Sequence, residues 1–160
     1  MKRKLICALL ILGLLFPAGC TTASEDMYSF YYLRSEESIV YGSPDALIAP
    51  VSMEITGQSK DLNYILGLYL DGPSQENFLS PFPRGTHLVS SHSDGDSLIV
   101  TLSEEFSALE DIHLILACAC LCRTCFALTD AESITIRCLS DTYTYQRGSF
   151  TFTETPAPID

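Results

Sequence analysis

Four cysteines within eight positions constrain the fold of this chain more than any other feature of its sequence. They stand in the segment LACACLCRTCF, residues 116–126, inside a long apolar run. Successive residues of a helix turn by about 100°, so Cys122 and Cys125 lie within about 40° of Cys118, and Cys120 lies about 160° away. We therefore expect a helix over 104–128 that buries an apolar stripe against a sheet, with Cys120 outside it beside His113 and Arg123. The predicted stripe consists of Leu114, Ile115, Cys118, Leu121, Cys122 and Cys125.

A metal site is an alternative use of the same cysteines. Structural zinc takes four ligands, usually from two separate segments of the chain, whereas this cluster supplies one segment. The histidines His87, His92 and His113 have no ligand-like spacing. We expect no metal ligand and no cofactor, and we keep a metal- or thiol-handling protein that uses the cluster Cys118–Cys125 as the alternative.

Redox chemistry and disulfide formation are the other interpretations of the thiols. A thioredoxin-type motif needs its cysteines near a helix N-terminus, where the dipole lowers the thiol pKa, and Cys122 and Cys125 are expected several turns inside the helix. A structural disulfide is more compatible with an exported protein, which meets oxidising conditions. Cys138 is expected on the inward face of the strand after the helix, so a bridge from Cys138 to Cys122 or Cys125 is the most plausible pairing.

The first twenty residues, MKRKLICALLILGLLFPAGC, have the pattern of an export signal. Three basic residues precede an apolar stretch over 5–16, which is shorter than the roughly 20 residues of a membrane-spanning helix. The segment resembles a bacterial lipoprotein signal, although Pro17 stands where that pattern prefers leucine. The resemblance implies cleavage between Gly19 and Cys20 and attachment of diacylglycerol and an acyl chain, such as palmitate, to Cys20. An ordinary secretory signal with a chance cysteine is the alternative.

The expected domain organisation follows from this signal. We predict a lipoprotein signal peptide over 1–19, a lipidated tether over 20–26, one folded domain over 27–152 and a flexible tail over 153–160. Twenty acidic and six basic residues follow residue 19, which gives a net charge of −14 for the mature chain. Phosphates repel such a protein, so nucleic acid is excluded as a partner. Membrane residence must come from the lipid at Cys20, on the extracytoplasmic side of the cell membrane.

The remaining patterning predicts an α+β domain. Alternating apolar residues from Leu47 to Ile55 indicate a half-buried strand, and Pro50 places it near a sheet edge. Gly72 and Pro73 end a helical pattern, and Asp94-Gly95 is a type I′ turn pair. The expected elements are strands over 28–34, 45–56 and 132–140, helices over 60–71 and 104–128, and hairpins over 86–103 and over 142–152, the last around Arg147-Gly148.

No residue set in this sequence is typical of catalysis, so we expect no enzyme. Ser90, Ser91, His92 and Asp94 lie in one predicted hairpin, but neighbours in a strand point to opposite faces and cannot form a triad by adjacency. Glu104 and Glu105 are expected to complement the dipole of the long helix, with Ser103 as its N-cap. The aromatic run over 28–32 could stack against a sugar ring, but strand aromatics more often fill a sheet surface or an interface.

The stretch over 64–106 resembles the GerMN domain of sporulation and spore-germination lipoproteins. The motifs that carry the resemblance are the helix ending at Gly72-Pro73, the segment PFPRGTHL over 81–88, the turn at Asp94-Gly95, and the strand LIVTLS leading to Glu105-Phe106. The segments TDAE and IRCLSDTY depart from the family pattern.

The resemblance covers about 27–152 and implies a two-layer sandwich, with a mixed or antiparallel sheet packed by two helices. It also implies a non-catalytic scaffold or protein-interaction role in sporulation, germination or cell-envelope machinery. The expected partners are other envelope or sporulation proteins, or further copies of the chain.

Overall fold

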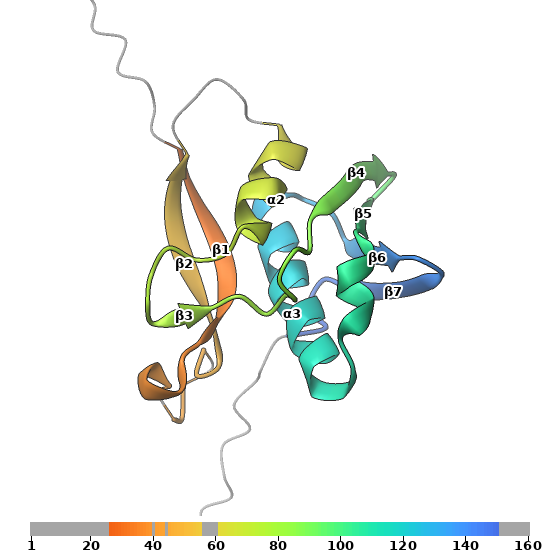
Figure 1. Ribbon diagram of the computed structural model, residues 1–160. Coiled ribbons are helices and arrows are strands. Elements are labelled where there is room, and N and C mark those ends of the chain that lie inside the picture. The colour runs from red at the N-terminus through yellow and green to blue at the C-terminus, as the bar shows by residue number, and fades with distance from the viewer. Residues whose placement is uncertain (1–25, 40, 44, 56–60, 151–160) are drawn as a thin grey trace, which may run out of the picture.

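The described part of the chain folds into an α+β domain with two α-helices and two sheets (Figure 1). The computed structural model describes residues 26–39, 41–43, 45–55 and 61–150. The three-stranded sheet has the order β2-β1-β3 and the four-stranded sheet the order β4-β5-β6-β7. The elements are β1 (Asp26–Arg34), the 3-10 turn η1 (Glu36–Ser38), β2 (Ile48–Ile55), α2 (Leu62–Leu70), β3 (Phe78–Leu79), β4 (Leu88–Asp94), β5 (Ser97–Leu102), the 3-10 turn η2 (Glu104–Ala108), α3 (Asp111–Leu128), β6 (Ser133–Cys138) and β7 (Asp141–Gln146).

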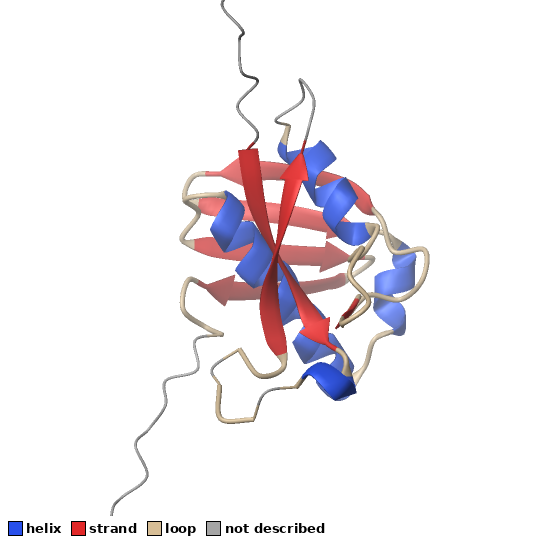
Figure 2. Cartoon of the chain, turned by 90° about the vertical axis from the view of Figure 1, so that its left-hand side faces the viewer, coloured by secondary structure: helices blue, strands red, loops and turns tan. Residues whose placement is uncertain are grey.

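The helices lie between the two sheets, as the view over β1 and β2 shows (Figure 2). In the four-stranded sheet, β5 and β6 are parallel and are joined by α3, whereas the β4–β5 and β6–β7 pairs are antiparallel. The predicted α+β class, the mixed sheet and the two packing helices are therefore confirmed. Strands β1, β2 and β3 form a separate sheet, which covers the other side of the helix layer.

Pro50 occupies a position of β2 where no backbone N–H is needed. It pairs with Tyr31 of β1, and Tyr31 directs its N–H to Thr124 and its carbonyl to the Tyr69 hydroxyl, away from β2. The pair is therefore a non-hydrogen-bonded one in the antiparallel ladder. Because β2 is an edge strand, as predicted, the missing donor of Pro50 breaks no ladder bond.

Helix α2 lies within the predicted range of 60–71 and spans Leu62–Leu70. The Asp61 carboxylate accepts a hydrogen bond from the backbone N–H of Asn63 at 3.4 Å, as an N-cap residue does. The helix ends before Gly72, which has a φ of +98° and so adopts the left-handed conformation that favours glycine. Its inward side carries Tyr69, whose ring lies 5.0–5.5 Å from those of Phe30, Tyr32 and Phe82.

The prediction of one continuous helix over 104–128 is wrong. Residues 104–108 form η2, Leu109 and Glu110 are extended, and α3 starts only at Asp111. Ser103 caps no helix, because its hydroxyl oxygen accepts a hydrogen bond from the His87 backbone N–H at 3.0 Å. Glu104 and Glu105 therefore stand at the start of the 3-10 turn rather than of the long helix.

Both predicted hairpin turns shift in the structure. Asp94 pairs with Ser97, so the turn residues are Gly95 and Asp96. Of these two only Gly95 has a positive φ, which excludes the predicted type I′ turn, since that turn needs a positive φ at both positions. The final hairpin joins β6 to β7 through the turn at 139–140. The predicted hairpin around Arg147-Gly148 is not formed within the described residues, because residues 147–150 form turns after β7 rather than a second strand, and residues 151–152 lie outside the described range.

Helix α3 is apolar around most of its circumference because both sheets pack on it. It is the one helix among the described residues that is long and apolar enough to cross a membrane. Its residues from Ala117 to Cys122 are all buried, and it contacts both β1 and β6. A helix enclosed on two sides is expected to lack a polar face, so its position in the core accounts for its composition.

Candidate functional site

The cysteines of α3 lie inside the protein. Cys118, Cys120, Cys122 and Cys125 are fully buried, and Cys138 of β6 is 1% exposed. All five are free thiols in the structure. The prediction that the stripe residues Cys118, Cys122 and Cys125 belong to the core is confirmed by this burial.

Burial also keeps these thiols protonated. Loss of solvation raises the pKa of Cys125 to about 12, and it raises that of Cys120 to about 12 against the opposing effect of Arg123. The same cause raises the pKa of Cys118, Cys122 and Cys138. The thiolate is the form that attacks electrophiles and binds metals, so the arrangement disfavours both kinds of chemistry at neutral pH.

Two predictions about the faces of α3 are wrong. Cys120, expected outside the buried stripe, packs with Ile48 and Ala119 in a second apolar cluster. Ile115, expected within the stripe, is 53% exposed. The reason is the second sheet, which covers the side of α3 that carries Cys120, whereas the first turns of α3 extend beyond the sheets.

Cys118 and Cys138 lie beside polar groups of the structure. Burial raises the pKa of Cys118, and the nearby Tyr145 side chain of β7 opposes this rise. The Cys138 thiol donates to the Ser103 carbonyl at 3.3 Å. The pairing of Cys138 with Cys122 or Cys125 in a disulfide stays a prediction. Over the described ranges, no group of three or more His, Cys, Asp or Glu side chains is arranged to hold a metal ion.

The aromatic run of β1 lies mainly in the core. Phe30 and Tyr32 are fully buried, and the Tyr32 hydroxyl donates to the Tyr69 carbonyl at 2.7 Å. Tyr31 lies on the other face of β1, with the Arg123 guanidinium 4.3 Å from its ring centroid. Arg123 also donates to Asp45 at 2.8 Å. This arrangement favours the structural role of the run over a sugar-stacking platform.

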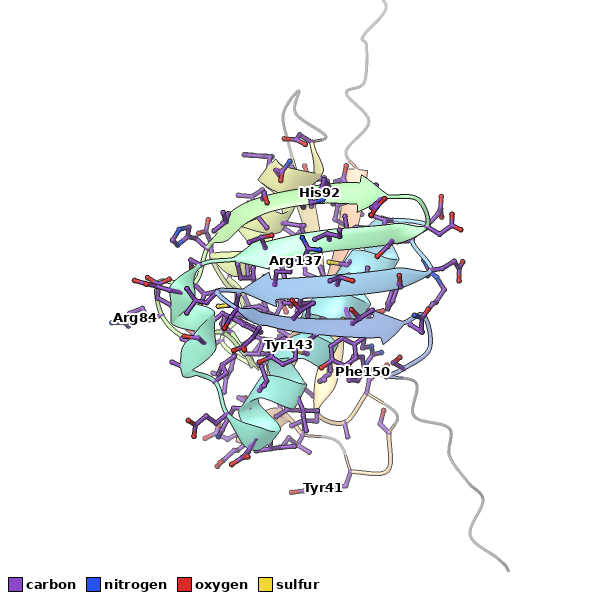
Figure 3. All side chains as sticks on the ribbon, turned by 90° about the vertical axis from the view of Figure 1, so that its right-hand side faces the viewer. Tyr41, Arg84, His92, Arg137, Tyr143 and Phe150 are labelled. Carbon is purple, nitrogen blue, oxygen red and sulfur yellow. The ribbon has the colours of Figure 1, made fainter. Side chains whose placement is uncertain are left out.

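The polar residues of β4 do not converge on one site. Ser91 faces α2, where its N–H and its hydroxyl both donate to the Asn63 side-chain oxygen, at 2.8 and 3.0 Å. His92 lies on the outer face of the four-stranded sheet, as does Arg137 (Figure 3). The geometry agrees with the prediction that Ser91 and His92 point to opposite faces.

A groove lies between α2 and the start of β4. It consists of two hollows of about 450 Å³ and about 480 Å³. Four residues line both hollows, which makes them one continuous groove: Leu70, Asp71, Thr86 and His87. One end is bounded by α2 and β4, and the other end by the segment over 80–85.

The groove carries charge and one unpaired polar atom. Asp71 is exposed, and no ion pair or side-chain hydrogen bond of its carboxylate is formed with the rest of the described chain. Arg84 lines the second hollow and projects away from the sheet (Figure 3). Thr86 is 7% exposed, and its hydroxyl oxygen is buried without a hydrogen-bond partner.

Sequence reasoning did not identify this groove. The segment PFPRGTHL is one of the motifs behind the resemblance to GerMN domains. Its sequence does not indicate that Thr86 and Asp71 line the same hollow. One signal was present: Gly67 interrupts a helical pattern, where glycine costs about 1 kcal/mol relative to alanine.

The fold is that of GerMN domains. The tandem GerMN domains of the sporulation protein GerM from Bacillus subtilis align with 78% of this chain and 43% of theirs, at a TM-score of 0.57 and 18% identity. The first GerMN domain of the same protein aligns with 74% of this chain and 86% of its own, at a TM-score of 0.55 and 11% identity. This chain thus spans less than half of the tandem structure.

A crystal structure of a proposed lipoprotein from Clostridium perfringens aligns with 77% of this chain and 88% of its own, at 18% identity. Its TM-score of 0.45 is too low to carry a conclusion. No protein-family profile and no curated protein matches the sequence. The class of protein defined here is therefore a domain of GerMN-like fold.

Several predictions lie outside the described residues. They are the signal peptide over 1–19, cleavage between Gly19 and Cys20, lipidation of Cys20, the tether and the C-terminal tail. They stay predictions from the sequence.

Proposed function

We propose that this chain is a membrane-anchored extracytoplasmic lipoprotein whose GerMN-like domain has a non-catalytic scaffold or protein-interaction role. The machinery it serves is that of sporulation, germination or the cell envelope. The observation that carries the proposal is the burial of all five described cysteines within a GerMN-like fold. Because the thiols of these cysteines lie in the core, they are not available for chemistry. The surface of the domain remains available for contacts with partner proteins.

The charge of the mature chain supports a lipid anchor rather than a charged contact with the membrane. Its net charge of −14 repels anionic headgroups. Stable residence at a membrane requires more than one acyl chain, which is what a lipoprotein signal ending at Cys20 supplies.

Replacement of Cys20 tests the anchor. We expect Cys20→Ala to move the protein from the membrane fraction to a soluble or secreted one and to abolish incorporation of an alkyne-labelled palmitate. Cys7→Ala is the matched control, since Cys7 belongs to the segment that is removed. A Cys20→Ala protein that stays in the membrane fraction would disprove lipid tethering.

Crosslinking in intact cells tests the interaction role. We expect crosslinks to a defined envelope protein, or between copies of the chain, that disappear when the domain is unfolded by the core variant Leu66→Asp. If the wild-type protein forms no crosslinks to any protein, the scaffold proposal is wrong. Elemental analysis of the purified protein addresses the alternative, because about one bound metal per chain would favour a metal-handling role.

A further inference from the structure

We propose that the groove between α2 and β4 binds an extended segment of a partner polypeptide, with a basic side chain of that segment beside Asp71. This inference rests on the proposed interaction function and adds the place and chemistry of the contact. The groove is open, about 450 and 480 Å³ in its two hollows, and it follows the edge strand of the four-stranded sheet.

Gly67 creates the space on the helix side of the groove. A Cβ atom added to this residue would meet no atom within 4 Å, so the position is open rather than tightly packed. Glycine inside a helix costs about 1 kcal/mol relative to alanine, and no close packing contact explains its presence here. The gap lies next to the exposed ring of Tyr64, which lines the same hollow.

The strand side of the groove offers backbone groups to a partner. The pairing of β4 with β5 shifts register between Leu88 and Ser90, which leaves Val89 without a paired residue. Val89 is 60% exposed and lines the first hollow. Farther along β4, Asn63 already binds the Ser91 N–H. Because β4 is an edge strand, an extended segment lying in the groove beside Leu88 and Val89 can add hydrogen bonds to its outer side.

The charges of the groove determine which segment fits. Asp71 lies where the two hollows meet, and its carboxylate has no cationic partner among the described residues. A lysine or arginine of the bound segment would supply that partner. Arg84 lines only the second hollow, so an acidic side chain or a C-terminal carboxylate is complementary at that end.

Peptide selection on the purified mature protein tests this proposal. A library of random twelve-residue peptides displayed on phage is selected for binding to the wild-type protein. Peptides that also bind Gly67→Tyr are removed, because the tyrosine ring of this variant would fill the first hollow. We expect enriched peptides to share a lysine or arginine. A synthetic version should bind at least about tenfold more weakly to Gly67→Tyr and to Asp71→Asn in fluorescence anisotropy.

Two controls separate a blocked groove from a damaged fold. Gly67→Ala adds only a methyl group and should retain binding, and Arg137→Gln, on the outer face of the sheet (Figure 3), should change binding less than about twofold. Thermal unfolding should show that Gly67→Tyr is folded. No enrichment over Gly67→Tyr, or peptides that bind both proteins equally, would overturn the proposal. If cellular crosslinks persist in Gly67→Tyr, the interaction function stands and the groove is not its site.

Discussion

The backbone N–H of Tyr31 donates a hydrogen bond to the Thr124 hydroxyl oxygen at 2.9 Å, although the two residues stand 93 positions apart. On the same stretch of β1, the Tyr69 hydroxyl donates to the Tyr31 carbonyl at 3.0 Å. Side chains from both helices thus satisfy a backbone position that faces away from Pro50 in β2. The bonds connect the three-stranded sheet to the helix layer, and they explain why a polar residue, Thr124, is fully buried in an apolar helix.

We predict that Thr124→Val destabilises the protein by about 1–3 kcal/mol, although valine has nearly the same shape. The substitution leaves the partly buried Tyr31 N–H without its acceptor, and an unsatisfied buried donor costs about that much. Urea unfolding measures the change. Thr144→Val, on the exposed face of β7, is the control and should stay within about 0.5 kcal/mol. Equal midpoints for the two variants would show that the Thr124 bond is unimportant.

The faces of α3 can be tested by comparing two substitutions on the same helix. Cys120→Gln places an amide in the apolar cluster with Ile48 and should destabilise the fold by several kcal/mol, about 2–4. Ile115→Gln should change the free energy of unfolding by less than about 1 kcal/mol, because Ile115 is largely exposed. Urea denaturation of both variants measures the two changes in the free energy of unfolding. If Ile115→Gln destabilised the protein more than Cys120→Gln, the helix orientation predicted from the sequence would be correct and that of the structure wrong.

The five buried thiols should not react with thiol reagents while the protein is folded. We expect no reaction with a thiol-specific chromogenic reagent at pH 8, because Cys118, Cys120, Cys122, Cys125 and Cys138 are buried and their pKa values are raised by burial. In urea, all five should react. Rapid labelling of the native protein would contradict the core assignment. Three reactive thiols in urea, rising to five after reduction, would reveal the predicted disulfide.

Stability should fall at alkaline pH. The pKa of Cys125 is raised from 9.0 to about 12 in the folded state, so above about pH 9 the unfolded chain releases a proton that the folded chain retains. The contribution is fully present below pH 9 and is lost progressively toward pH 12, at up to about 1.4 kcal/mol per pH unit for each such thiol.

The urea midpoint, followed from pH 7.5 to 10.5, measures this effect. Cys125→Ala lowers stability at every pH by leaving a cavity, but it should also flatten the alkaline slope relative to wild type. An unchanged slope in this variant would show that Cys125 does not contribute to the pH dependence.

The order of elements could be predicted from local pattern. The alternation in β2, the end of α2 at Gly72 and the inward face of β6, with Ile134, Ile136 and Cys138, depend on side-chain periodicity and turn chemistry that act within a few residues. These features agree with the structure. The boundary between η2 and α3 could not be predicted in this way, because the acidic and apolar residues over 104–116 suit one long helix as well as two segments.

By itself, the sequence determined that this chain forms an α+β domain with a cysteine-bearing core helix. Only the tertiary structure decided which sides of that helix are buried, since a periodicity argument assumes one covering sheet and α3 has two. Cys120 and Ile115 exchange their expected environments for this reason. The groove also exists only in the folded protein, because Asp71 and Thr86 come together through the packing of α2 beside β4, which no local pattern encodes.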